Sequence, residues 1–116
     1  MNLPIAEARS EIEFARVISL LDLVRYQEGS VVSRMIINTN NGNVTLFSFD
    51  CGQGLSEHTS PFDALVQVLD GEVEITISGK IMKAKAGEVV RLQAGQPHKL
   101  KAVTQLKMLL TMIRSR

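Results

Sequence analysis

The clearest pattern in this chain is an alternation of polar and apolar side chains over residues 72–77, "EVEITI". Two glutamates and a threonine take one set of alternate positions, and a valine and two isoleucines take the other. This period of two predicts an antiparallel strand with one buried and one solvated face. Residues 44–50 alternate less cleanly. We expect Leu46 and Ser48 to face one way, and Thr45, Phe47 and Phe49 to face the other.

Short apolar or alternating segments continue through most of the chain and are separated by turn residues. The segments expected to be strands are residues 30–38, 44–50, 64–69, 72–77, 80–86, 88–93, 99–103 and 106–113. The turns are expected at Asn41-Gly42, Asp70-Gly71, Ser78-Gly79 and Gly87. Many short strands with turns about every eight to twelve residues predict an all-β sandwich or barrel.

The first 25 residues allow two interpretations. The stretch "AEARSEIEFARVISLLDLV" has the composition of a helix, whereas its part "FARVISL" also fits a strand that leads into a short turn at residues 21–24. We favour an early strand followed by a loop. The length of 116 residues predicts one domain over residues 1–116, with a core at about residues 31–113 and an N-terminal strand and loop extension over residues 1–30.

Composition and charge exclude several classes of function. The net charge of +1 gives no basic footprint for nucleic acid and no polybasic signal for a membrane. No apolar run approaches the roughly 20 residues of a membrane span. The N-terminus has acids among its apolar residues and does not resemble a signal peptide. Cys51 is the only cysteine, which rules out an internal disulfide and favours a cytoplasmic location.

The chain contains two glycine–histidine patterns, one with Gly52, His58 and Gly71 and the other with Gly87, Gly95 and His98. They resemble the two motifs of the cupins, small proteins built on a double-stranded β-helix, or jelly-roll barrel. The first motif has a glycine, an H-x-H pair, a glutamate and a closing glycine, and the second has a glycine, P-x-G, a histidine and an asparagine. The positions that match are Gly52, His58, Gly71, Gly87, Gly95 and His98. The resemblance covers roughly residues 31–113 and implies an all-β cupin-like barrel. It implies little about function, because this fold hosts many chemistries.

The chain departs from the two motifs at four positions, and two of these are residues that bind metal in the family; the other two are Gln93 in place of the proline and Ala102 in place of the asparagine. In metal-binding cupins both histidines of H-x-H, the glutamate and the second-motif histidine are the ligands. Here Ser60 stands in place of the second histidine and Ala64 in place of the glutamate. Only His58 and His98 carry over, so the resemblance implies two of the four metal ligands.

Two histidines can serve in several ways. They can hold a divalent transition metal such as Fe, Mn, Ni, Cu or Zn, with water or substrate in the other positions. They can satisfy structural hydrogen bonds, or they can form a polar patch that binds and exchanges protons with a ligand. We favour a ligand pocket lined by His58, Ser60, His98 and Gln53, with His58 and His98 as the candidate metal ligands. Asp63, one position from Ala64, is expected to face the opposite way on a strand.

Two functional hypotheses follow. The first is a stand-alone cupin-like barrel that binds a small organic ligand in its pocket, with no reaction assigned. The alternative is a metal-assisted small-molecule enzyme, an isomerase, decarboxylase or dioxygenase, with a reduced two-histidine site. A role in the folding or assembly of another protein also stays open. The apolar N-terminal stretch and residues 106–113 exceed what one small barrel needs on one face, so we also expect a homodimer.

Overall fold

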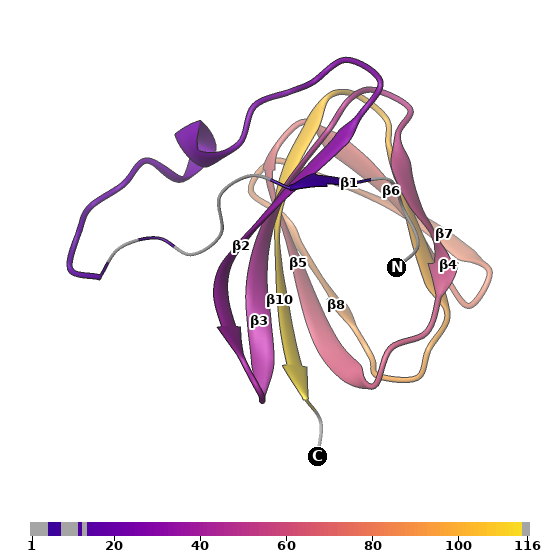
Figure 1. Ribbon diagram of the computed structural model, residues 1–116. Helices are drawn as coiled ribbons and strands as arrows, with labels where there is room; N and C mark the ends of the chain where they lie inside the picture. Colours follow the sequence, from indigo (N-terminus) through magenta and orange to yellow (C-terminus); the bar gives the residue numbers. More distant parts are fainter. Residues whose placement is uncertain (1–4, 8–11, 13, 115–116) are drawn as a thin grey trace.

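The chain forms two β-sheets that face each other across a common core (Figure 1). The computed structural model describes residues 5–7, 12 and 14–114. Their elements are β1 (Ile5–Glu7), a 3-10 helix η1 (Leu20–Leu23), β2 (Val31–Thr39), β3 (Gly42–Phe49), β4 (Gly54–His58), β5 (Phe62–Asp70), β6 (Glu72–Ile77), β7 (Lys80–Lys85), β8 (Val89–Leu92), β9 (His98–Ala102) and β10 (Leu106–Arg114). No helix in this described part is long and apolar enough to cross a membrane.

The strand order identifies the fold. One sheet has six strands in the order β1-β2-β3-β10-β5-β8, and the other has four in the order β4-β9-β6-β7. Consecutive strands therefore cross repeatedly between the two sheets, as they do in a jelly roll. The inner faces of both sheets are apolar, and their central side chains, among them Phe49, Val66, Ile75 and Met108, are completely buried. The expected all-β, double-stranded β-helix fold is confirmed.

The alternating segment forms β6 as predicted. Val73 and Ile75 are fully buried in the core, and the intervening Glu74 lies on the outer face. The turn into β7 is formed by Ser78 and Gly79, whose φ angles are 48° and 82°. Positive φ at both central residues is typical of a type I′ turn, which matches the twist of the strands that it joins.

The hairpin between β2 and β3 turns one residue earlier than expected. Thr39 pairs with Gly42, so Asn40 and Asn41 form the turn and Gly42 begins β3. A β-carbon on Gly42 would lie 2.1 Å from the carbonyl oxygen of Met112 on the neighbouring β10. Gly42 is therefore required by close approach of another strand rather than by the turn itself.

The expectation of a strand over residues 14–20 is wrong. Residues 14–19 form a turn and irregular backbone, and the expected short turn that follows is the 3-10 helix η1. Apart from the four residues of η1, the described residues of this stretch are not helical either, and an early strand occurs instead at β1, parallel to β2. The part of the prediction on residues 8–11 and 13 lies outside the described residues.

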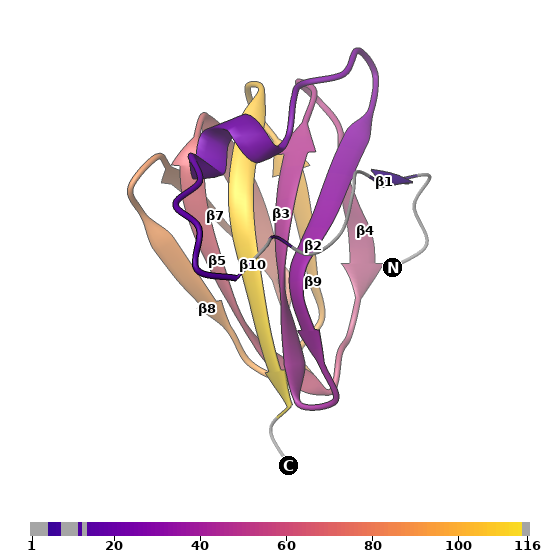
Figure 2. The same cartoon turned by 60° about the vertical axis from the view of Figure 1, so that its left-hand side comes forward.

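The segment around η1 lies against the outer face of the six-stranded sheet (Figure 2). Leu20, Leu23 and Val24 pack there on a second apolar cluster that includes the fully buried Leu46. The hydroxyl of Ser48 donates a hydrogen bond of 2.8 Å to the carbonyl oxygen of Arg25. Leu46 and Ser48 therefore lie on the sheet face opposite to Phe47 and Phe49, as expected. This is the outer face, and the N-terminal segment buries them there.

Candidate functional site

The two histidines are brought together by strand β4, which the sequence did not predict. The glycines at positions 52 and 54 indicated a loop, yet residues 54–58 pair with β9. Gly54 fits this pairing because a β-carbon there would lie 2.2 Å from the carbonyl oxygen of Leu100. His58 ends β4 and lies directly opposite His98, the first residue of β9. Their ring centroids are 4.5 Å apart, with the ring planes at 64°.

Backbone carbonyl groups set the orientation of both rings. Nδ1 of His58 lies 3.0 Å from the carbonyl oxygen of Ser56, and Nδ1 of His98 lies 3.1 Å from that of Gln96. A carbonyl oxygen only accepts hydrogen bonds, so each Nδ1 carries the proton. In a neutral imidazole of this tautomer, Nε2 has a free lone pair and acts as an acceptor.

Burial favours the neutral form of His98. The side chain is only 7% exposed, and desolvation lowers the pKa of His98 below its ordinary value. The hydrogen bond to Gln96 opposes this shift, and the nearby His58 adds to it. His98 is therefore neutral near pH 7, and its Nε2 presents a lone pair rather than a proton.

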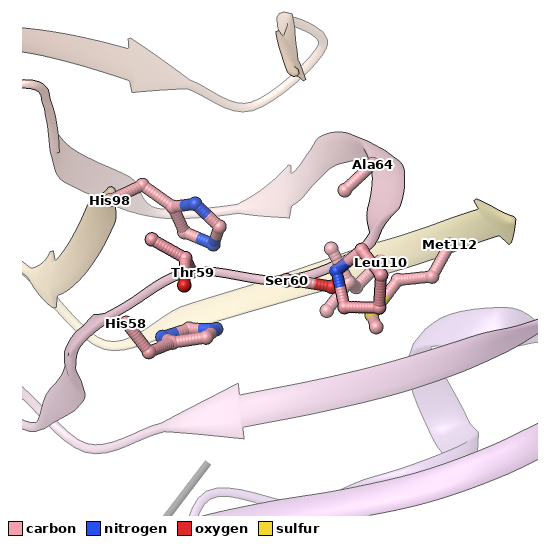
Figure 3. A pocket seen from close by; sticks show the side chains of 8 residues that line it. His58, Thr59, Ser60, Ala64, His98, Leu110 and Met112 are labelled. Carbon is pink, nitrogen blue, oxygen red and sulfur yellow. The ribbon is translucent and has the colours of Figure 1, made fainter. Parts of the chain in front are cut away.

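A pocket of about 240 Å³ lies beside the histidine pair (Figure 3). Its lining combines the two imidazoles and two hydroxyl residues with an apolar wall. The lining residues are His58, Thr59, Ser60, Pro61, Ala64, His98, Leu110 and Met112. In Figure 3 the imidazoles lie at one side and Leu110 and Met112 at the other, with Ser60 between them.

The structure brings three of the four expected pocket residues together. His58, Ser60 and His98 line the same pocket. Gln53 does not lie there, because its carbonyl oxygen accepts a hydrogen bond of 2.8 Å from the backbone N–H of Ala102, at the far end of β9 from His98. Leu110 and Met112 were missed as pocket residues. The alternation of side chains along β10 could have identified them, because every second side chain of this strand faces the core.

The nearby carboxylates do not complete a metal site. Asp63 faces away from the histidines, as expected from its register, and its Oδ1 accepts a hydrogen bond of 2.8 Å from the N–H of Ala94. Glu57 is exposed on β4. Ala64 lines the pocket but offers no ligand atom. Within the described residues no group of three or more His, Cys, Asp or Glu side chains is placed to hold a metal ion. The donor set for a metal here is two imidazoles.

Comparison with known proteins gives the family. The family model described as "Cupin domain" matches residues 45–114, which include both histidines. The chain is a cupin. This cupin is similar to a conserved protein of unknown function from Streptococcus pyogenes, with 35% identity, a TM-score of 0.87, and coverage of 91% of this chain and 93% of that one.

Two further solved structures agree. A cupin superfamily protein from Desulfitobacterium hafniense has 25% identity and a TM-score of 0.83, over 89% of this cupin and 94% of that chain. A cupin 2 conserved barrel domain protein from Leptotrichia buccalis has 39% identity and a TM-score of 0.80, over 83% of this cupin and 47% of that chain. No curated protein matches this cupin. The small single-domain cupin suggested by the two motifs is confirmed.

Proposed function

We propose that this cupin binds a small organic ligand in the histidine pocket and does so without a tightly bound metal. The observation that carries the proposal is the pair of imidazoles at one side of the pocket, each held by a backbone carbonyl at Nδ1. The volume of about 240 Å³ lies below the roughly 300–1,000 Å³ of pockets for drug-sized ligands. The ligand we expect is therefore a molecule of a few heavy atoms.

The chemistry of the walls narrows the class of ligand. An imidazole that carries its single proton at Nδ1 offers Nε2 as an acceptor, so a ligand that meets both rings should donate two hydrogen bonds. Leu110, Met112 and Ala64 favour a short apolar portion at the opposite side. A small vicinal diol or primary amine with a short alkyl group has both features. A carboxylate lacks the donors and would need a protonated imidazole, which the burial of His98 disfavours.

Binding of 1,2-propanediol and of propylamine, with propionate as the comparison, tests the proposal. Chemical shift changes in 15N-labelled protein should cluster around the pocket for the two donors and be weaker for propionate at pH 7.5. The His58→Ala variant should bind up to about tenfold more weakly, because it loses about one neutral hydrogen bond. Gln53→Ala, outside the pocket, should bind as the wild type does. Equal responses to all three compounds, or shifts remote from the residues that line the pocket, would count against the proposal.

A metal-assisted enzyme is the second candidate, and one observation favours it. Histidines that bind metals commonly donate their other ring nitrogen to a backbone carbonyl or carboxylate, as both rings do here. Imidazole suits Zn, Cu, Fe and Ni, and water or substrate would supply the other ligands. In that case His58 and His98 hold the metal, which would act on a substrate as a Lewis acid or redox centre.

Elemental analysis of protein purified without a metal-affinity tag separates the two candidates. Near-stoichiometric Fe, Mn, Ni, Cu or Zn, lost in His58→Ala, would replace the first proposal with the second. Protein free of metal that cannot be reloaded supports the first. We also propose a reducing compartment such as the cytoplasm, because the single cysteine, Cys51, is an exposed free thiol.

A further inference from the structure

A polar hollow of about 480 Å³ lies at the β8 edge of the six-stranded sheet. Its lining residues are Asp63 of β5, Arg91 of β8, and Gln93 and Gln96 of the loop between β8 and β9. All four have polar side chains, in contrast to the partly apolar lining of the histidine pocket. β8 is the last strand of its sheet, so no further strand closes this side (Figure 2). We call this hollow, with its four lining residues, the edge pocket.

The strand register places Asp63 and Arg91 on one face of the sheet. Arg91 pairs with Leu65 across β8 and β5, and Asp63 is two residues from Leu65 along β5. Residues two apart on a strand face the same way, so Asp63 and Arg91 are diagonal neighbours, typically roughly 7–8 Å apart. This is the outer face, because the residues between them in the register, Ala64 and Leu92, are buried in the core. A negative and a positive side chain therefore border the same hollow.

The two charges are not used up within the chain. Among the residues that the structure describes, the guanidinium group of Arg91 forms no hydrogen bond and no ion pair within 4.0 Å. Asp63 accepts a hydrogen bond of 2.8 Å from the N–H of Ala94 at Oδ1, which holds its carboxylate beside the loop and leaves Oδ2 available. A carboxylate and a guanidinium that face one hollow without pairing leave room for a ligand that carries both charges.

We propose that the edge pocket binds a free α-amino acid in its zwitterionic form. The guanidinium of Arg91 donates a pair of hydrogen bonds to the ligand's carboxylate, a geometry for which arginine is suited. Oδ2 of Asp63 accepts a hydrogen bond from the ligand's ammonium group. The carboxamides of Gln93 and Gln96 offer donors and acceptors and favour an uncharged polar side chain. The volume lies within the roughly 300–1,000 Å³ of small-molecule sites.

Ligands with a single charge fit the edge pocket less well. An anion that pairs with Arg91 also meets the carboxylate of Asp63, and a cation that pairs with Asp63 meets the guanidinium. Arg91 alone would serve to block pairing of another strand with the exposed edge of β8. That role requires neither the carboxylate nor the two carboxamides that share the hollow. The zwitterion is the ligand that uses all four side chains.

Nuclear magnetic resonance titration of 15N-labelled full-length protein tests the proposal at pH 7.5. L-glutamine should bind with a Kd of about 1 mM or lower, as expected for a ligand of this size. N-acetyl-L-glutamine keeps the carboxylate but lacks the ammonium group, and L-glutaminamide keeps the ammonium group but lacks the carboxylate. Each should bind about tenfold more weakly, because it loses hydrogen bonds between charged groups.

Two variants assign each charge of the ligand to its partner. In Arg91→Gln, L-glutamine should lose its advantage over L-glutaminamide, because the partner of the carboxylate is gone. In Asp63→Asn, which keeps an acceptor oxygen for Ala94, L-glutamine should lose its advantage over N-acetyl-L-glutamine. The matched control is Lys101→Gln, which removes an exposed cation from β9 in the other sheet and should leave all three affinities unchanged.

The result is distinguishable from ligand binding in the histidine pocket, on which this inference does not rest. His58→Ala should leave the affinity for L-glutamine unchanged, and Arg91→Gln should leave binding of propylamine in the histidine pocket unchanged. No binding of L-glutamine at millimolar concentrations would overturn the proposal. Binding that survives both Arg91→Gln and Asp63→Asn, or that is lost in His58→Ala, would overturn it as well, since the ligand would then lie elsewhere.

Discussion

A third imidazole in the pocket should convert it into a metal site. Ser60 lines the pocket together with His58 and His98 and stands where the resemblance places the second histidine of H-x-H. A Ser60→His variant would therefore present three histidines, which is a common protein ligand set for zinc. Groups that only support the metal ligands contribute roughly 10–100-fold to metal affinity. A third direct ligand should therefore raise the affinity for zinc by at least this factor.

The stability effects can be worked out from the structure. Ser60 Oγ accepts a hydrogen bond of 3.1 Å from the N–H of Phe62, and its loss should cost about 1 kcal/mol. For 116 residues the unfolding entropy is about 0.24 kcal/mol per degree, so Tm should fall by about 4 °C without metal. Zinc at about 100 times its Kd adds about 2.7 kcal/mol, which should raise Tm by about 11 °C.

Differential scanning calorimetry with zinc and with chelator measures both effects. The matched control is Gln53→His, which adds an imidazole at a position outside the pocket. Wild type and Gln53→His should share the same small response to zinc. A Gln53→His variant that gains as much as Ser60→His, or a folded Ser60→His variant that gains nothing, would refute the placement of Ser60 beside the histidine pair.

Three further predictions concern stability. The pKa of His98 is lower in the folded chain than in the unfolded chain, so as the pH falls below about 6.5 the unfolded state takes up a proton at this residue first. The free energy of unfolding should therefore decrease from pH 7 to pH 5. Denaturant titrations should show a smaller decrease in His98→Asn. Tyr26→Phe removes the hydrogen bond that Tyr26 donates to Asp70 and should lower the free energy of unfolding by about 1 kcal/mol in urea titrations. An unchanged free energy of unfolding would mean that this hydrogen bond adds no stability beyond what hydrogen bonds to water provide. Gly71→Ala and Gly79→Ala both place an alanine at a positive φ angle, but only Gly71→Ala places a β-carbon 1.9 Å from a carbonyl oxygen. In the same titrations Gly71→Ala should therefore lower the free energy of unfolding by at least about 1 kcal/mol more than Gly79→Ala does. Equal losses would contradict this.

Much of the fold was predictable because the deciding signals are local. The period of two over residues 72–77 places Val73 and Ile75 in the core, and the Ser78-Gly79 turn needs only the conformational freedom of its own residues. The two glycine–histidine patterns also indicated which segments, distant in the sequence, lie side by side in the fold. They predicted that His58 and His98 meet in a pocket with Ser60, and this is how the structure places these three residues.

The remaining features depend on contacts between distant segments. Gly54 and Gly42 were taken as loop and turn residues, but each is required where the carbonyl group of a neighbouring strand approaches closely. A strand was expected over residues 14–20 because its apolar residues resemble those of a strand. In the structure Leu20 and Leu23 instead cover the outward-facing Leu46. Gln53 fell outside the pocket because β4 runs from Gly54 to His58 and carries Gln53 to the opposite end of β9.

The central claim is that both imidazoles carry their protons at Nδ1 and present the lone pairs of Nε2 for binding. Long-range 1H–15N correlation spectra of the histidine side chains test this directly. At pH 8 the account predicts an unprotonated Nε2 and a protonated Nδ1 for His58 and for His98, with the Nε2 signals moving when a donor ligand binds. A protonated Nε2 on either ring, or Nε2 signals that ignore every donor ligand that binds, would contradict it.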